Sequence, residues 1–235
     1  MNEIYRSSRF IDFNEGRVIL DPEAFVENTS RPWTVTEKID FFECRVEVWQ
    51  LGVAVEMLKQ IEANAPPSIW SHAAYGLLSV IVSYFEMVGK VLNPNSKPSY
   101  TASVDFNWGF CNVYPDFCTA PEKSQSSEED YTDSAVPHVA KLRDLMRNGM
   151  YHLGFPKKNF LIHNSQEIPT DFQFVCVRDQ QDGQAAIGIV YLMNPHRVTR
   201  SLVDHFSGII VALRQTSNSD LRNKFEQFFD EYDVT

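Results

Sequence analysis

The feature that most constrains the fold is a stretch with apolar residues on nearly every side of a helix, from Tyr75 to Val91. The run "NAPP" separates it from the segment before it, Ser68 lies near its start, and "NPNSKP" ends it. A helix that is apolar all round lies at the centre of its domain. Other helices must therefore pack around residues 68–91.

Two further segments have the pattern of helices in such a bundle. The first begins at Thr34 or Thr36, either of which can cap it, and runs to about residue 63 without proline. The second is capped by Ser134, has a proline in its first turn and ends near residue 154. Between the central helix and this one, residues 93–133 include the polar tract "PEKSQSSEEDYTD" and are predicted to form a long loop.

Strand patterns follow the third helix. The runs "NFLIHN", "DFQFVCVRD" and "AAIGIVYLM" are rich in β-branched and aromatic residues, and "DQQDGQ" between the last two predicts a hairpin turn. A second hairpin is predicted near the N-terminus in "RFIDFNEGRVIL". Asn194 as cap and Pro195 at the first position begin a further helix, and "SDLRNKFEQFFDEY" predicts a short last one.

These patterns together predict a mainly α fold: an antiparallel helical bundle with a small β-sheet insertion before its last helices and an N-terminal hairpin. We expect a single domain over residues 1–235. Its parts are an N-terminal extension (1–35), a bundle core (36–155) with the loop at 93–133, the β insertion (156–193) and the C-terminal helices (194–235).

The start of the chain has no basic segment followed by an apolar stretch, and the longest apolar run is shorter than the roughly 20 residues that span a bilayer. We therefore expect a cytoplasmic protein without a membrane partner. The four cysteines form no CxxC pair, and the spacing from Cys111 to Cys118 does not favour zinc. Reduced structural thiols are the expectation.

The third helix carries an arginine, an asparagine and a histidine near its end, in "MRNGMYHLGF". At about 100° per residue, its core side is formed by Leu142, Met146, Gly149, Met150 and Leu153. We place on the opposite arc Arg143, Asp144, Arg147, Asn148, Tyr151 and His152. Because Arg147 and His152 lie about 140° apart, one helix cannot bring both to one small group. Either the helix distorts at Gly149, or a second copy of the motif supplies the partner.

Arg147-Asn148 followed by His152, after two long helices of which one reads "YGLLSVIVSYFEMVGKV", resembles the HEPN domains. Members of that family are small helical bundles, and their RNase-active branches set two such motifs across a dimer cleft. The resemblance covers roughly residues 36–215 in architecture and six residues in motif. It implies a metal-independent endoribonuclease that acts on RNA as a homodimer without a cofactor. It also implies a role in stress response, phage defence or a toxin–antitoxin pair, with an antitoxin or regulatory protein as partner.

The chemistry of these side chains fits RNA cleavage independently of the resemblance. The reaction removes a proton from the 2′-hydroxyl, gives a proton to the leaving 5′-oxygen and builds charge on the phosphate. Histidine titrates near neutrality and can make either transfer, while arginine binds phosphate oxygens without a metal. We therefore predict Arg147 and His152 as catalytic residues, with Asn148 fixing the histidine ring or holding a phosphate oxygen.

A formal net charge of −10 argues against indiscriminate binding of nucleic acid, so the role needs a local basic patch. Residues 138–163 contain five lysines and arginines against a single aspartate. The predicted RNA-binding residues are Lys141, Arg143, Tyr151, Lys157 and Lys158. On the alternative interpretation, the lysines at 157 and 158 only decorate a loop before a strand.

Glu86 and the pair Arg200 and His205 are two further candidate sites. Glu86 stands in the otherwise apolar central helix with Lys90 four residues later, which is typical of a partly exposed ion pair. In a bundle, Glu86 could instead support Arg147. Arg200 and His205 repeat the arginine–histidine spacing, but His205 lies beside a core stripe, which favours a packed histidine over a catalytic one.

Two other functions stay open. One is a non-catalytic HEPN-like module that binds a nucleotide or a protein, which the acidic tract in residues 93–133 favours. The other is a helical interaction protein in which the motif is accidental. The sequence contains no Walker loop, GxSxG or HExxH motif, which leaves kinase, hydrolase and metalloprotease chemistry without the residues it needs.

Overall fold

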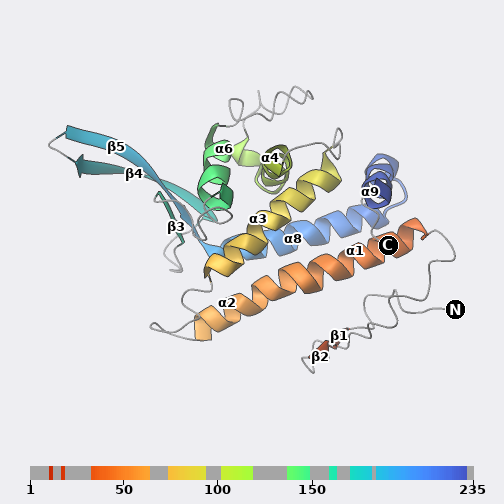
Figure 1. Ribbon diagram of the computed structural model, residues 1–235. Coiled ribbons are helices and arrows are strands. Elements are labelled where there is room, and N and C mark those ends of the chain that lie inside the picture. The colour runs from red at the N-terminus through yellow and green to blue at the C-terminus, as the bar shows by residue number, and fades with distance from the viewer. Residues whose placement is uncertain are drawn as a thin grey trace.

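The computed structural model describes residues 11–12, 17–18, 33–63, 74–93, 102–118, 137–148, 159–162, 170–181 and 184–231. The described fold is mainly helical, with a small three-stranded sheet beside the helices (Figure 1). The predicted N-terminal hairpin is present as β1 (Ile11–Asp12) and β2 (Arg17–Val18), which pair antiparallel. The prediction of a mainly α fold with a small β-sheet is confirmed.

The first predicted helix is a long rod built of three consecutive pieces (Figure 1). They are α1 (Val35–Val46), the π-helical segment η4 (Glu47–Gly52) and α2 (Val53–Ala63). Of the two threonines considered, Thr34 is the cap. Its hydroxyl accepts a hydrogen bond from the Glu37 backbone N–H, and the Glu37 carboxylate accepts one from the Thr34 backbone N–H.

The central helix is α3 (Ala74–Leu92), and its position agrees with the prediction. Leu77, Leu78, Ile81, Val82 and Phe85 are all 0% exposed. In Figure 1, α3 crosses between α4 on one side and the α1–α2 rod with α8 on the other. By length and composition α3 alone, among the described helices, would also qualify as a membrane span. The core helix of a globular protein passes the same test of length and composition, so the test does not distinguish the two. The cytoplasmic location stays a prediction.

The loop predicted at 93–133 contains a helix, and this part of the prediction is wrong. The helix α4 (Ala102–Val113) is followed by a 3-10 turn, η6 (Pro115–Phe117). Phe106 and Phe110, four residues apart, are fully buried and contact Phe85 of α3 edge to face. The segment "SVDFNWGFCNV" is rich in residues of low helix propensity, so only packing against α3 makes it helical.

The backbones of α3 and α4 touch at two glycines. A Cβ atom on Gly89 would lie 1.8 Å from the carbonyl oxygen of Asp105, and one on Gly109 would lie 1.8 Å from the carbonyl oxygen of Phe85. Any other residue type at either position would push the two helices apart. The close crossing therefore depends on both glycines.

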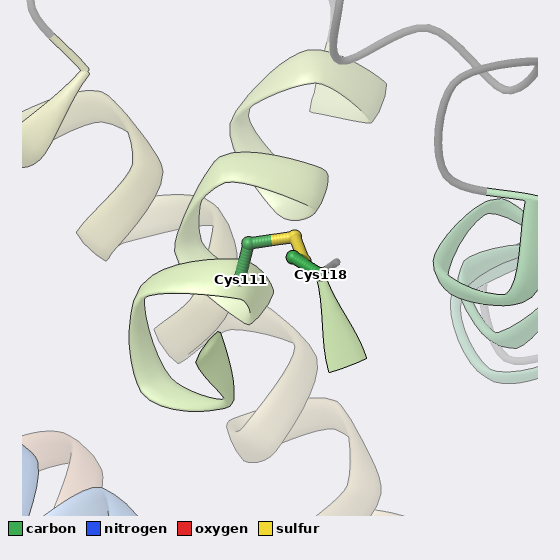
Figure 2. The surroundings of a disulfide bond; sticks show 2 residues. All are labelled: Cys111 and Cys118. Carbon is green, nitrogen blue, oxygen red and sulfur yellow. A yellow bond between two sulfur atoms is a disulfide. The ribbon is translucent and has the colours of Figure 1, made fainter. Parts of the chain in front are cut away.

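Cys111 and Cys118 form a disulfide that joins the last turn of α4 to the residue after η6 (Figure 2). Their Cα atoms are 5.8 Å apart, within the range that a disulfide bridges. The expectation of reduced thiols is therefore wrong for this pair, because α4 and η6 fold back to bring the two cysteines together. Cys44 is free and half-buried. The side chain of Cys176 lies outside the described residues.

The β insertion is confirmed as β3 (Phe160–Ile162), β4 (Phe172–Gln181) and β5 (Gln184–Met193), in the order β3-β5-β4. The strands β4 and β5 form an antiparallel hairpin that extends away from the helices in Figure 1. β3 pairs parallel with β5. At the end of the hairpin nearest the helices, Phe172 of β4 pairs with Met193 of β5, and both side chains are buried.

Two helices complete the chain as predicted. They are α8 (Pro195–Arg214), with Asn194 capping the backbone N–H groups of His196 and Arg197, and α9 (Ser219–Glu231). The predicted core stripe of α8 is buried: Leu202, Phe206, Ile209, Ile210 and Leu213. Phe206 contacts Phe42 of α1, and Phe42 contacts Phe225 of α9, so one aromatic cluster joins the three helices.

Candidate functional site

Arg147 lies near the end of the third predicted helix. This helix consists of α6 (Pro137–Arg143) and the π-helical segment η8 (Asp144–Asn148). Val139, Leu142 and Met146 are buried, as the predicted core side requires. Arg147 follows Met146 and reaches toward α3, where its side chain is 24% exposed. The π-helical turns thus end in a half-buried guanidinium group at the edge of the bundle.

Glu86 of α3 is the partner of Arg147. The Nε–H of Arg147 donates to Oε1 of Glu86, and the Glu86 side chain is 18% exposed. The sequence favoured an ion pair of Glu86 with Lys90 and left the contact with Arg147 as the alternative. The structure contains the alternative contact, which ties η8 to α3.

Lys90 forms an ion pair with α4, where its Nζ atom lies 3.2 Å from Oδ2 of Asp105. The carboxylate of Asp105 is fully buried. The pKa of Asp105 is raised above its ordinary value, mainly because the carboxylate is buried. The charge of Glu86 also raises this pKa, and the charge of Lys90 acts in the opposite direction. Two ion pairs, Arg147–Glu86 and Lys90–Asp105, thus join α3 to η8 and to α4, and we call these four residues the ionic cluster.

The other predicted RNA-binding residues on this helix differ in position. Lys141 is exposed, and its Nζ lies 4.0 Å from the Asp144 carboxylate. Arg143 is only 7% exposed, so its expected place on the outer arc is wrong. At about 100° per residue Arg143 falls only about 40° from the buried Val139. Ala140 and Leu145 are buried as well, so the core side of this helix is wider than its apolar stripe.

The remaining predicted site residues lie partly or wholly outside the described part of the chain. Asn148 is the last residue of η8, and its side chain is not among the described ones. Tyr151, His152, Lys157 and Lys158 lie outside the described residues. Whether Arg147 and His152 meet, within one chain or between two, therefore stays a prediction.

A second polar site surrounds His205 on α8. Its Nδ1 lies 2.9 Å from the Tyr84 hydroxyl, and its Nε2 lies 2.9 Å from Oδ1 of Asn112. Because the amide oxygen of Asn112 can only accept, Nε2 carries the proton and the Tyr84 hydroxyl donates to Nδ1. Burial lowers the pKa of His205 to about 4, so the ring is neutral near pH 7. His205 is a packed histidine, in agreement with the sequence interpretation.

A third polar group centres on Asp171, just before β4, and sequence reasoning missed it. Its Oδ2 accepts hydrogen bonds from Tyr114 at 2.9 Å and from Ser201 at 2.5 Å. Its backbone carbonyl accepts from the N–H of Asn194, the cap of α8, at 2.9 Å. Asp171 thereby joins η6, the sheet and α8. Only the position of an aspartate directly before a strand could have pointed to it.

Within the part of the chain that the structure describes, no group of three or more histidine, cysteine, aspartate or glutamate side chains could hold a metal ion. The expectations of metal independence and of no cofactor remain predictions. The described part of the predicted site is the guanidinium group of Arg147 held at Nε by the Glu86 carboxylate.

Comparison of the chain with protein families, with curated protein sequences and with solved structures found no match in any of the three.

Proposed function

We propose that this protein is a metal-independent endoribonuclease of the HEPN type, active as a homodimer. The observation that carries the proposal is the contact of Arg147 with Glu86. A carboxylate from the central helix holds the Nε side of the guanidinium group and so fixes its direction at the edge of the bundle. A fixed cation stabilises charge that develops on a phosphate better than a mobile one does.

In the proposed reaction, the 2′-hydroxyl of RNA attacks the adjacent phosphate and the 5′-oxygen leaves. His152 transfers the proton at one of these oxygens, and Arg147 stabilises the negative charge on the phosphate. Asn148 fixes the histidine ring or holds a phosphate oxygen. The products are a 2′,3′-cyclic phosphate and a free 5′-hydroxyl.

The spacing of the motif supports the dimer. Arg147 and His152 are five positions apart, so they diverge on one regular α-helix. The helix is π-helical up to Asn148, and the residues from Gly149 to His152 lie outside the described part of the chain. In the proposed dimer, two motifs face one another across a cleft, and each active centre uses the arginine and the histidine of both.

The proposed RNA path is basic. Lys141 is exposed on α6, Tyr151 lies within the motif, and Lys157 and Lys158 follow the motif in sequence. Lysines bind the phosphate backbone, and tyrosine provides a surface on which a base stacks. Arg143 is left out of this path because it is buried.

A second function, a non-catalytic HEPN-like module that binds a nucleotide or a protein such as an antitoxin, is supported by two observations. Arg147 is paired with Glu86, and Lys141 lies near Asp144, so part of the basic charge is balanced within the protein. The net charge of −10 also disfavours a long nucleic-acid footprint. This alternative predicts binding without cleavage.

The purified protein, incubated with single-stranded RNA in EDTA, tests the proposal. We expect cleavage with 2′,3′-cyclic phosphate ends, because no metal is needed and the 2′-hydroxyl is the nucleophile. Single-stranded DNA of the same sequence, which lacks that hydroxyl, should stay intact. Cleavage that requires an added divalent metal would contradict the mechanism, and binding of RNA or nucleotide without cleavage would favour the second function.

A further inference from the structure

We propose that the Cys111–Cys118 disulfide is a redox-sensitive latch that holds the end of α4 against α8 and the start of the sheet. The disulfide closes the segment from Cys111 to Cys118, which contains the last residues of α4 and all of η6, and the latch is this closed segment. The inference does not depend on the proposed ribonuclease activity.

The latch carries two of the polar contacts described above. Asn112, directly after the first cysteine, accepts a hydrogen bond from His205 of α8 at 2.9 Å. Tyr114 donates to Asp171 at 2.9 Å, and Asp171 also binds Ser201 of α8. A loop that the disulfide closes over seven residues thus contacts both α8 and the segment before β4.

Aromatic packing places the same segment on the sheet. The ring centroids of Tyr114 and Phe172 are 5.4 Å apart, and those of Phe117 and Phe172 are 6.3 Å apart. Phe117 also contacts Phe110, one turn before the end of α4, at 5.6 Å. The disulfide keeps Phe117 folded back on α4, so both rings stay in place against β4.

Opening the latch is a two-electron exchange with a dithiol reductant. A thiolate of the reductant attacks one cysteine sulfur, breaks the S–S bond and releases the other sulfur as a thiolate. The second thiol of the reductant, as its thiolate, then attacks the reductant's sulfur in the mixed disulfide and releases the remaining cysteine thiolate. The two cysteine thiolates take up the two protons that the reductant gave up, which leaves two cysteine thiols and an oxidised, cyclic reductant. Cys111 is 7% exposed and Cys118 is 3% exposed, so the exchange requires a local opening of the latch.

The first test is chemical. Protein purified without reductant is denatured, alkylated and digested, and the peptide that contains Cys111 and Cys118 is weighed. We expect a peptide without alkyl groups on these cysteines and lighter by two hydrogens than the dithiol form. Alkylation of both cysteines in protein exposed to air or to oxidised glutathione would overturn the proposal.

The second test is structural and uses hydrogen exchange of the folded full chain with and without dithiothreitol. We expect reduction to speed exchange in residues 112–118 by about 10-fold or more and to lower Tm by roughly 5 to 10 °C. The double variant Cys111→Ser/Cys118→Ser should exchange like the reduced protein and not respond to dithiothreitol. Cys44→Ser, which changes a free cysteine, should keep the full response. Equal exchange in residues 112–118 of the oxidised and reduced protein would overturn the latch.

Discussion

At the scale of single residues, the hydrogen bonds of His205 tell against chemistry at the Arg200–His205 pair, while His152 lies outside the described residues. His205 is enclosed by Tyr84 and Asn112, and both of its ring nitrogens are used. A neutral histidine with both nitrogens engaged is poorly suited to proton transfer at neutral pH. Arg147 is half-buried and held at Nε, as expected of a group that binds an anion.

The depressed pKa of His205 predicts a pH dependence of stability. Its pKa is about 4 in the folded protein and 6.5 in the unfolded chain, so the unfolded chain binds more protons between these values. The stabilisation that the neutral His205 ring gives the folded protein is complete above pH 6.5 and is lost as the pH falls toward 4. Because the ring keeps some contact with solvent, we expect a loss on the order of 1 to 2 kcal/mol.

Urea unfolding of the wild type and of His205→Gln, from pH 7 to pH 4, measures the contribution of His205 to the free energy of unfolding. Glutamine does not titrate, so the wild type should lose more of its free energy of unfolding over this range than the variant does. Parallel pH profiles for the two proteins would show that His205 is not held in its neutral form.

Glu86 is predicted to act on catalysis through Arg147. Glu86→Gln keeps the shape of the side chain but removes its charge, so the guanidinium group is held less firmly. We expect the rate of RNA cleavage to fall roughly 10-fold or more, since small losses of orientation are costly. Glu56→Gln, on the exposed face of α2, is the matched control and should keep the wild-type rate. A folded Glu86→Gln protein with the full rate would contradict this role.

At the scale of elements, the crossing of α3 and α4 sets the position of the ionic cluster. Lys90 and Asp105 meet across this crossing, and Glu86 lies one turn away on α3. The crossing is close only because Gly89 and Gly109 lack side chains. Helix packing, rather than local propensity, therefore brings Lys90 to Asp105.

The glycines give a direct test of this crossing. Gly89→Ala and Gly109→Ala would each place a Cβ atom 1.8 Å from a backbone carbonyl oxygen, so we expect each to lower the free energy of unfolding by on the order of 2 to 4 kcal/mol. Gly208→Ala on α8 is the control. Its Cβ atom would meet nothing within 4 Å, so it should gain about 0.5 to 1 kcal/mol of helix stability. Thermal or urea unfolding measures all three, and a neutral Gly89→Ala would contradict the close crossing.

Elements whose signals are local were predictable from the sequence. Thr34 and Asn194 are caps, and the apolar pattern of α3 marks the central helix. The helix α4 was missed because its aspartate, asparagine and glycine residues are tolerated only through contacts with α3. Contacts between distant segments, such as Glu86 with Arg147 or Tyr114 with Asp171, have no local signal that selects one partner over another. The disulfide was missed for the same reason.

At the scale of the whole molecule, the proposed enzyme needs a second copy of the chain. Arg147 and His152 would diverge on a regular α-helix, so we propose that a second copy brings both residue types to one phosphate. Light scattering should therefore give a mass near twice 27.0 kDa at micromolar concentration. A strict monomer that still cleaves RNA would show that one chain completes the site, and a monomer without cleavage would favour the binding module.

The most direct measurement of the central claim is the rate of RNA cleavage in EDTA by three folded proteins: the wild type, His152→Ala and His205→Ala. The account predicts that His152→Ala loses a factor on the order of 10² to 10⁴, the usual weight of a positioned acid or base. His205→Ala should keep cleaving at close to the wild-type rate, because the ring of His205 is packed against Tyr84 and Asn112. Full activity in His152→Ala, or loss of activity only in His205→Ala, would contradict the proposed site.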